Sequence, residues 1–492
     1  YDLCQHLPQI FAPEAWEVHK GEDGTEEIVV AIIDNGVYWR HQDLAENIWQ
    51  NLGEDADGDG HTMEYNGSIW IIDPDDINNT DDDGNGFTDD VIGWDFGMNN
   101  YNPDHNWGEN HGTHCSGITA GVTNNGTGLA SISWNIKTMP VQVTAETGTF
   151  DHAYDGIIYA AENGADAASN SWSSPVPSQA NQEAITYAQQ LGTVIFGSAG
   201  NTNSTQLRYP ASYTGVISVA SVSVDDVKAA YSSYGPAVDI SCPGGGTEGG
   251  ILSTLPFNGY GLMSGTSMAC PMTAGSFGLL KSYHPDWTNE ELIIQFLGSA
   301  DDIGALNPDH LNLLGTGRVN AYEFLTAENV TMPQLLKIEL ASTGYADANG
   351  NQINEPGETV FLNLEFRNFM PCVAVDDVTV TMTTEDPWVT ILEGNAITSI
   401  PADGYFTVND QLQFQVNEDA SSHYVEFLVT FESETTISWG LEHTVEVLVA
   451  PSGTYIFEGV PNGRDHSGKF IKEILDQLEI HNVYANTYPP TL

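Results

Sequence analysis

Residues 28–36 read Ile-Val-Val-Ala-Ile-Ile-Asp-Asn-Gly, and this stretch decides the fold class. The first six residues are apolar and mostly β-branched, which is typical of a strand that is buried on both faces. Strands of that kind belong to parallel sheets, so the run predicts a parallel sheet. Asp34 ends the run at its carboxyl end, where functional groups gather in open α/β sheets. Asp34 is therefore a candidate catalytic carboxylate.

A candidate histidine lies further along the chain. Residues 111–121 read His-Gly-Thr-His-Cys-Ser-Gly-Ile-Thr-Ala-Gly, and their small side chains predict a helix that packs closely against its neighbours. An alternative remains open for His111, because a histidine beside glycine often does no more than begin a helix. An aspartate after a strand, such as Asp34, is likewise often only a turn residue or a cap.

A candidate nucleophile lies within residues 265–271, which read Gly-Thr-Ser-Met-Ala-Cys-Pro. Ser267 follows a glycine turn that opens an apolar helix of small residues running to Leu280. The start of a helix favours nearby negative charge. A serine hydroxyl is nevertheless a poor nucleophile unless a base removes its proton. The serine therefore matters only together with His111 and Asp34.

Together the three segments resemble the subtilisin-like serine proteases, the subtilases. That family carries an aspartate at the end of a strand, His-Gly-Thr-His on a helix and Gly-Thr-Ser-Met-Ala around its nucleophile, in the chain order Asp…His…Ser that is also found here. The resemblance extends from about residue 8 to residue 325, and residues 315–321 are similar to the family's closing element. It implies an α/β domain whose mostly parallel sheet has helices on both faces.

The resemblance also implies a role for each residue. Ser267 attacks a peptide carbonyl, His111 takes the proton and passes it to the leaving amine, and Asp34 fixes the imidazole tautomer. The second histidine of the motif, His114, is then structural.

Residues 193–201 resemble the strand that carries the family's oxyanion-hole asparagine. The resemblance implies that the Asn201 side chain and the Ser267 backbone N–H donate to the negative oxygen of the tetrahedral intermediate. The alternative is that Asn201 only supports the turn after a strand. Ser198 departs from the family, which more often has alanine there.

Residues 170–174 read Asn-Ser-Trp-Ser-Ser and resemble the family's edge strand, which pairs with the substrate backbone and lines the first specificity pocket. Arg208 matches a position near the floor of that pocket, where it would favour an acidic substrate residue. The alternative is an arginine that points to solvent or pairs with a nearby carboxylate. The residues expected to bind substrate are Ser171, Trp172, Ser173, Gly200 and Arg208.

The chain is strongly acidic, with 68 Asp and Glu against 12 Lys and Arg among 492 residues and a formal charge of −56. A polyanion of this kind is not expected to bind nucleic acid or anionic membranes. Two interpretations of the acidity remain open. In the first interpretation, the acidic residues of particular loops bind cations. In the second, the general acidity keeps the protein soluble in salty water, where screening weakens the repulsion between its charges.

The chain begins at Tyr1 without a signal peptide, and its sequence has no apolar run long enough to cross a membrane. These features predict a processed chain without an integral membrane segment. Subtilases are typically secreted as precursors, so the resemblance implies secretion and a propeptide that assists folding and is then removed.

Five cysteines leave at least one unpaired. Cys4 and Cys242 are a candidate disulfide pair. Cys115 and Cys270 lie beside the candidate histidine and serine, and we expect them to be buried small side chains rather than nucleophiles.

Two acidic loops between Asp34 and His111 have the spacing of calcium loops. Calcium prefers six to eight oxygen ligands, alternate loop positions turn carboxylates inward, and glycine at the sixth position allows the tight turn. The alternative is a solvated acidic loop in an acidic protein. The residues expected to bind Ca²⁺ are Asp55, Asp57 and Asp59 in the first loop, and Asp81, Asp83, Asn85, Asp89 and Asp90 in the second.

Two further calcium positions are expected. Asp95 forms one candidate group with Asn100, Asn102 and Asp104. Asp43, with Asn124, resembles a calcium site of the family, although its usual N-terminal partner is not evident. In all these sites calcium would hold together loops whose like charges repel, so its role is stability rather than catalysis.

The pattern changes after about residue 325. Short alternating strands separated by turn signals predict an antiparallel β-sandwich of the immunoglobulin-like type. They lie at 360–366, 378–382, 411–416, 425–429 and 445–449. The predicted domains are residues 1–328 (subtilisin-like), 329–450 (β-sandwich) and 451–492, a short strand–helix–strand tail.

The prediction from sequence is therefore a secreted, calcium-stabilised serine endopeptidase of the subtilase family that acts on polypeptides. The alternative is an inactive subtilase scaffold that serves adhesion or surface binding. That alternative would be favoured if Asp34, His111, Ser267 or Asn201 were missing, and all four are present.

Overall fold

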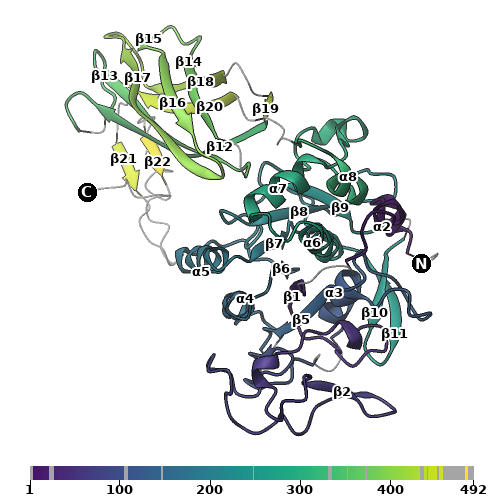
Figure 1. The fold of residues 1–492 in the computed structure, drawn as a ribbon. Helices are drawn as coiled ribbons and strands as arrows, with labels where there is room; N and C mark the ends of the chain where they lie inside the picture. Colours follow the sequence, from purple (N-terminus) through teal and green to yellow (C-terminus); the bar gives the residue numbers. More distant parts are fainter. Residues whose placement is uncertain are drawn as a thin grey trace. The chain divides into compact units, whose positions relative to one another are not determined.

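The fold is taken from a computed structural model of the chain (Figure 1). The chain forms two compact units, residues 1–337 with 369–373 and residues 338–368 with 374–492, which we call the N-terminal and C-terminal units. The residues that the structure describes are 4–21, 27–104, 109–145, 148–247, 249–330, 335–351, 353–371, 374–432, 437–439, 442–450, 454–457 and 482–485.

The N-terminal unit is built on a seven-stranded sheet in the order β4-β5-β1-β6-β7-β8-β9. Every neighbouring pair in it runs parallel, which confirms the parallel sheet predicted from residues 28–36. Its strands are β1 (Val29–Asp34), β4 (Trp94–Asp95), β5 (Lys137–Gln142), β6 (Ala167–Asn170), β7 (Val194–Ser198), β8 (Ile217–Val222) and β9 (Ile240–Pro243).

Both faces of the sheet are covered by helices, as predicted (Figure 1). All of β1 is buried, which explains its unbroken apolar run. Val29, Ala31 and Ile33 pack in one core cluster with Ile157 of α4 and Ile185 of α5, and the other face carries α3 and α6. The helices are α3 (His111–Ala120), α4 (Ala153–Glu162), α5 (Gln179–Gln190) and α6 (Thr266–Tyr283).

Strand β1 lies where the chain changes its direction across the sheet. It pairs with β5 on one side and with β6 on the other. The chain passes from β1 through β4 and β5, and then continues on the other side through β6 to β9. Ligands of open α/β sheets bind outside the carboxyl ends of strands at such a point. Asp34 is the last residue of β1.

A long insertion lies between β1 and α3. It contains β2 (Met63–Tyr65) and β3 (Trp70–Ile72), an antiparallel hairpin in which Met63 pairs with Ile72. The two acidic loops predicted to bind calcium lie on either side of this hairpin in the sequence.

The remaining helices and strands of the N-terminal unit are short, except for α7, which begins with a capping box between Thr288 and Glu291. They are α1 (His6–Gln9), α2 (Ala12–Trp16), η1 (Ala45–Asn47), η2 (Leu52–Glu54), β10 (Ile251–Leu255), β11 (Gly259–Met263), α7 (Asn289–Gly298), η3 (Gly304–Leu306), η4 (Pro308–His310) and α8 (Ala321–Thr326).

The C-terminal unit contains two antiparallel sheets, in the orders β15-β17-β13-β12-β19 and β16-β14-β18-β20. Alternate side chains of β13 and β18 are buried, which is the pattern that predicted a sandwich. Phe366 of β13 and Phe431 of β18 meet edge to face with their ring centroids 4.9 Å apart. The strands are β12 (Leu335–Asp347), β13 (Thr359–Asn368), β14 (Val375–Thr383), β15 (Val389–Glu393), β16 (Asn395–Ile400), β17 (Gly404–Val416), β18 (His423–Glu432), β19 (Ile437–Trp439) and β20 (Glu442–Val449).

The tail is described in part. Strands β21 (Thr454–Phe457) and β22 (Asn482–Ala485) pair in parallel. A parallel pair requires a crossover connection. The helix predicted over 467–478 lies outside the described residues.

The cysteines differ from one expectation. Cys4, Cys115, Cys242 and Cys270 are buried free thiols, so the disulfide suggested between Cys4 and Cys242 is wrong. Burial raises the pKa of Cys242 to about 12, which keeps this thiol protonated. It therefore packs as a small apolar side chain. Cys372 lies outside the described residues.

Candidate active site

Asp34 and His111 meet at the carboxyl end of β1. The Nδ1 atom of His111 lies 2.9 Å from both carboxylate oxygens of Asp34. Burial lowers the pKa of His111, but Asp34 and the neighbouring Cys115 outweigh it, so the pKa stands well above its usual value of 6.5. Because Nδ1 is engaged by Asp34, Nε2 is the ring nitrogen that can exchange a proton with a reacting group.

The approach of α3 to β1 depends on a glycine. The Gly112 N–H donates to Asn35 Oδ1 at 2.9 Å. A Cβ atom added to Gly112 would lie 2.4 Å from the Gly36 carbonyl oxygen and 3.0 Å from Asp34 Cβ. A side chain at this position would push α3 away from the end of β1. The small residues of 111–121 therefore set the contact between His111 and Asp34.

Ser267 lies in the first turn of α6, which begins at Thr266. The first N–H groups of a helix have no partner within the helix, and the helix dipole favours negative charge there. The Ser267 hydroxyl donates to the Ser171 carbonyl at 3.1 Å, and the Ser171 hydroxyl donates to the Ser267 carbonyl at 2.9 Å. This exchange ties the start of α6 to the segment that follows β6.

Cys115 connects the histidine with the serine. Its Sγ atom lies 3.9 Å from His111 Nδ1 and 3.4 Å from the Ser267 carbonyl oxygen. Burial raises the pKa of the Cys115 thiol, so it stays protonated and weakly nucleophilic. The expectation that Cys115 packs rather than reacts fits this environment.

His114 is fully buried and faces away from this chemistry. Its Nε2 atom lies 3.2 Å from the Gly261 carbonyl oxygen of β11. Burial lowers the pKa of His114 to about 4, so the ring is neutral near neutral pH. This environment agrees with a structural role.

Asn201 follows β7 and lies next to the start of α6. Its Oδ1 atom accepts hydrogen bonds from the backbone N–H and the hydroxyl of Thr266, at 2.9 and 3.0 Å. These two bonds assign the oxygen side of the amide and turn Nδ2 the other way. A Cβ atom on Gly265 would lie 3.4 Å from Nδ2. The amide donor thus lies beside the turn that carries Ser267.

A cavity of about 680 Å³ opens beside His111. Phe150, Tyr154 and Trp172 give it an aromatic wall. The Trp172 ring stacks on Phe150 at 5.9 Å and meets Tyr154 edge to face at 5.4 Å. Ser171, Trp172 and Ser173, which are expected to bind substrate, line this same cavity.

The segment expected to be an edge strand is less regular than predicted. Strand β6 ends at Asn170, and Ser174 then exchanges two hydrogen bonds of 2.8 Å with Tyr209. Trp172 gives the physical reason, because its buried ring donates from Nε1 to the Ile33 carbonyl at 3.1 Å. The pairing of 170–174 with a substrate backbone, which the resemblance implies, stays a prediction.

Arg208 packs against the glycine that precedes Asn201. A Cβ atom on Gly200 would lie 3.2 Å from Arg208 Cγ, and Gly200 has a φ of 102°, which favours glycine. Arg208 lines a smaller cavity with Ser212, Ser233 and Tyr234, apart from the cavity beside His111. Its Nε atom is buried without a hydrogen-bond partner among the described residues.

The second acidic loop forms a carboxylate cluster that includes a residue the sequence did not indicate. One carboxylate oxygen each from Glu54, Asp83 and Asp90 lies within 4.8 Å of the others, and Glu54 and Asp90 are fully buried. Glu54 also accepts from the backbone N–H groups of Asp82 and Asp83 at 2.9 and 3.1 Å. Glu54 escaped the sequence prediction because it lies far upstream of the loop, outside its regular spacing.

The other predicted ligands of this loop hold its turns. Asp81 accepts from Gly84 and Gly86, and Asn85 Oδ1 accepts from Phe87. Asp89 accepts from the N–H groups of Asn78 and Asn79, so it faces another turn.

The electrostatics of this cluster favour a cation. Burial raises the pKa of Asp90 to about 7, even though the Tyr159 hydroxyl and Asn85 donate to it, and the charges of Asp83 and Glu54 add to the rise. Carboxylates this close, two of which are buried, repel one another unless a positive charge lies between them. Oxygen ligands of this kind fit Ca²⁺.

The first acidic loop has the same kind of turn as the second loop, in which Asp81 accepts from Gly84 and Gly86. Asp55 accepts from Gly58, Asp59 and Gly60, and Asp57 accepts from Asp59 at 3.0 Å. One carboxylate oxygen each from Asp55, Asp57 and Asp59 lies within 4.8 Å of the others. The three predicted ligands of this loop are thus brought together.

The carboxylates at the last two predicted calcium positions accept hydrogen bonds or pair with charged groups of the protein. Asp95 accepts from Met98 N–H at 2.9 Å. Asp104, expected beside it, forms an ion pair with Arg40 at 2.9 Å. Asp43 is fully buried and accepts from Asn125 Nδ2 and Leu129 N–H, both at 2.8 Å.

Comparison with known proteins places this site in a family. A sequence profile described as "Subtilase family" matches residues 25–317. Thermitase of Thermoactinomyces vulgaris is 34% identical over 322 residues, which cover 65% of this chain and 95% of that protein. The halolysin-like extracellular serine protease Nep of Natrialba magadii is 31% identical over 327 residues, covering 66% of this chain and 52% of that protein.

A solved protease structure from Pseudoalteromonas arctica PAMC 21717 is 30% identical to this chain and covers 64% of it and 93% of that chain, with a TM-score of 0.48. Within the described part of the chain, no helix combines the length and the apolar character that crossing a membrane would need.

The extent of the family match and the identity to thermitase decide the assignment: the chain belongs to the subtilase family of serine proteases.

Proposed function

We propose that the protein is a secreted, calcium-stabilised serine endopeptidase that cleaves polypeptides through Asp34, His111 and Ser267. The observation that carries this proposal is the contact of His111 Nδ1 with both oxygens of Asp34, 2.9 Å each, beside the cavity of about 680 Å³. Ser267 is tied to Ser171, which lines that cavity.

In the proposed reaction, the Ser267 hydroxyl first turns from the Ser171 carbonyl towards His111. Its oxygen then forms a bond to the peptide carbonyl carbon, and its proton passes to His111 Nε2. His111 gives that proton to the departing amine as the carbon–nitrogen bond breaks. Water, activated by the same imidazole, then releases the acyl group from Ser267. Asp34 holds Nδ1–H throughout and stabilises the imidazolium that forms.

The developing negative oxygen needs donors that are already in position. Asn201 Nδ2 and the Ser267 N–H at the start of α6 are the proposed pair. The hydrogen bonds from Thr266 to Asn201 Oδ1 support this role, because they hold the amide with its donor side towards Gly265. Removal of one such donor costs about 10²–10³-fold in kcat, a magnitude measured in subtilisin, a member of this family.

The cavity beside His111 is proposed to receive the acyl side of the substrate. Its aromatic wall of Phe150, Tyr154 and Trp172 fits apolar side chains, while Ser171 and Ser173 lie along its edge. Arg208 keeps two proposed roles: a contact with an acidic substrate side chain, or an arginine that points to solvent or pairs with a nearby carboxylate. Its buried Nε has no hydrogen-bond partner among the described residues, but it lines a cavity apart from the one beside His111, and a cleavage-site profile of Arg208→Ala distinguishes the two roles.

Calcium is proposed to bind both acidic loops and to act on stability. The second loop would use Glu54, Asp83 and Asp90, and the first would use Asp55, Asp57 and Asp59. A bound Ca²⁺ would supply the positive charge that these carboxylates lack. Asp81, Asn85, Asp89, Asp95 and Asp43 stay as proposed ligands or supports of these and neighbouring sites.

Secretion from a precursor is the remaining part of the proposal. It is supported by the similarity to Nep, whose name describes an extracellular serine protease. The proposed peptidase domain spans residues 1–328, followed by a sandwich at 329–450 and the tail at 451–492.

The variant Ser267→Ala tests the proposed activity. We expect it to reduce cleavage of an unfolded protein substrate by about 10⁶-fold, because the nucleophile is lost while the binding cavity remains. Ser264→Ala, an exposed serine three residues upstream, serves as the control and should keep full activity. Equal activity of the two variants would contradict the proposal. An inactive but folded wild-type chain would favour the scaffold alternative.

A further inference from the structure

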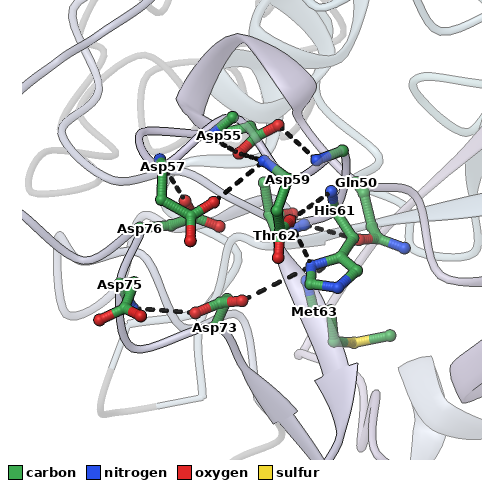
Figure 2. A network of polar contacts seen from close by, with 12 residues as sticks. Gln50, Asp55, Asp57, Asp59, His61, Thr62, Met63, Asp73, Asp75 and Asp76 are labelled. Atoms are coloured by element: carbon green, nitrogen blue, oxygen red, sulfur yellow. Dashed lines mark hydrogen bonds and ion pairs between the residues drawn. The ribbon is translucent and has the colours of Figure 1, made fainter.

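A third group of side chains with the chemistry of metal ligands lies beside the first acidic loop, and only one of its members was expected from the loop spacing. His61 Nδ1 lies 2.8 Å from Asp59 Oδ1 and 3.5 Å from Asp73 Oδ2. The three ligand atoms lie within 4.8 Å of one another. Figure 2 shows the carboxylates of Asp59 and Asp73 approaching the same nitrogen of this ring.

The hairpin β2–β3 holds two of these side chains opposite each other. His61 lies just before β2, and Asp73 comes directly after β3. The pairing of Met63 with Ile72 continues through a hydrogen bond of 2.9 Å from Asp73 N–H to the Thr62 carbonyl. The position of His61 relative to Asp73 is therefore set by the hairpin and does not depend on an ion.

Asp76 supplies an independent sign that a ligand belongs here. Its side chain is fully buried, and one oxygen accepts from the Ala56 N–H at 2.8 Å. The other oxygen, Oδ2, is buried and has no hydrogen-bond partner in the part of the chain that the structure describes. An anionic oxygen left in this state is costly unless a cation or a bound water meets it. The N–H groups that reach the first oxygen belong to Ala56 and Asp57, so the Asp76 carboxylate lies against the first acidic loop (Figure 2).

The charges of the group do not balance without a metal ion. Asp59 and Asp73 both contact His61, and Asp59 also lies with Asp55 and Asp57 in the first acidic loop. A proton on His61 adds at most one positive charge and does not reach the unpartnered oxygen of Asp76. A divalent ion adds two charges and can bind several of the oxygens at once.

The imidazole decides which kind of ion fits. Calcium is bound by oxygen atoms, whereas zinc and its neighbours in the transition series favour imidazole nitrogen together with carboxylate. The His61 side chain is 41% exposed, which leaves the ion a path from solvent, while the Asp73 side chain is 8% exposed and anchors the site.

We propose that His61, Asp59 and Asp73 bind a divalent transition-metal ion of the zinc type, with Asp76 facing it directly or through a bound water. The ion joins the first acidic loop to the β2–β3 hairpin. This site shares the Asp59 carboxylate with the calcium position proposed in the first acidic loop, but its nitrogen ligand distinguishes it from the calcium positions, which use oxygen ligands only. It does not depend on the peptidase activity.

The test is a titration of the whole, chelator-treated protein with Co²⁺, a coloured probe for zinc sites, in excess Ca²⁺ that fills oxygen-only sites. We expect one equivalent of Co²⁺ to bind with a visible absorption band and to be displaced by Zn²⁺. His61→Ala should weaken Co²⁺ binding by more than about tenfold. The matched control is His152→Ala, because His152 pairs with a single carboxylate, that of Asp155 at 3.1 Å, and is 43% exposed. This control should bind Co²⁺ like the wild type.

Three results would overturn the proposal: no Co²⁺ binding, displacement of Co²⁺ by Ca²⁺, or equal affinity in His61→Ala and the wild type. Far-UV circular dichroism shows whether each variant is folded. Thermal unfolding gives a second measurement, in which Zn²⁺ added above saturating Ca²⁺ should raise the Tm of the wild type and of His152→Ala but not of His61→Ala. An equal rise in all three proteins would also count against the site.

Discussion

The His111 imidazole must be neutral to accept the Ser267 proton, and its pKa decides at which pH this holds. Burial lowers that pKa, but Asp34 and Cys115 raise it well above 6.5. Below the raised pKa the ring is protonated and cannot act as a base. We therefore expect kcat/KM to increase with pH along a limb whose midpoint lies above 6.5, measured with a peptide substrate.

The variant Asp34→Asn checks the cause of that midpoint. It should move the midpoint to lower pH, because the carboxylate charge is gone, and should reduce kcat by about 10⁴-fold. The control is Asp155→Asn, which changes a carboxylate that pairs with His152 in the described structure. It should leave the midpoint of the pH dependence unchanged. A midpoint that stays unchanged in Asp34→Asn would show that Asp34 does not set the pKa of His111.

Single residues differ in how well the sequence could predict them. Asp34, His111 and Ser267 lie in local motifs, so each could be named from its neighbours in the chain. Glu54 and Asp73 lie outside any spacing rule, and only the folded insertion brings them to Asp83 and His61. No local pattern could have identified these two residues.

At the scale of elements, helix α3 approaches β1 through a glycine contact. A Cβ atom at Gly112 would meet the Gly36 carbonyl oxygen at 2.4 Å and must displace it. We expect Gly112→Ala to lower the free energy of unfolding by about 1–3 kcal/mol, as overpacking does, and to reduce kcat because His111 shifts away from Asp34. Chemical denaturation and kinetics measure the two effects.

Gly246→Ala is the matched control for that substitution. A Cβ atom there would lie 3.4 Å from Ser223 Cβ, which is ordinary contact. It should leave both kcat and stability nearly unchanged. If Gly112→Ala behaved like Gly246→Ala, the close approach of α3 would not be what sets the Asp34–His111 contact.

Elements were predictable where one pattern decided them. The run at 28–33 could only be a strand buried on both faces, and β1 is one. The segment 170–174 resembles an edge strand that pairs with substrate, but β6 ends at Asn170 and the buried Trp172 ring donates to the Ile33 carbonyl. Its irregular course comes from a contact with Ile33, which is distant in the sequence.

At the scale of the whole molecule, charge limits stability. The chain carries a formal charge of −56, and two acidic loops concentrate it. If calcium neutralises these loops, removal of Ca²⁺ with EDTA should lower the Tm measured by calorimetry. When the free Ca²⁺ concentration is a hundred times the Kd of a site, that site contributes about 2.7 kcal/mol to the free energy of unfolding. Asp83→Asn should lower the Tm in Ca²⁺ and reduce the effect of EDTA.

Sodium chloride separates specific binding from screening. Salt screens exposed charges over about 10 Å at 0.1 M, but it does not replace a bound ion. After EDTA, restoration of the Tm by NaCl alone at the ionic strength of the calcium buffer would contradict specific calcium sites. Restoration by Ca²⁺ alone is the expected result.

The architecture of the molecule followed from sequence more readily than its loops did. A parallel sheet with helices on both faces and a following antiparallel sandwich were both predicted, because periodicity and motif order carry that information. The insertion of residues 35–110 has little periodicity, so its hairpin and its clusters of carboxylates depend on contacts that only the fold provides.

The most direct test of the proposed mechanism is covalent labelling by a fluorophosphonate, which reacts with a serine only when a base activates it. The account predicts one label per molecule, located by mass spectrometry on Ser267, and almost no label in His111→Ala, while Ser264 stays unmodified. Label on another serine, or equal labelling of Ser267 in the wild type and in His111→Ala, would contradict the role of Asp34, His111 and Ser267.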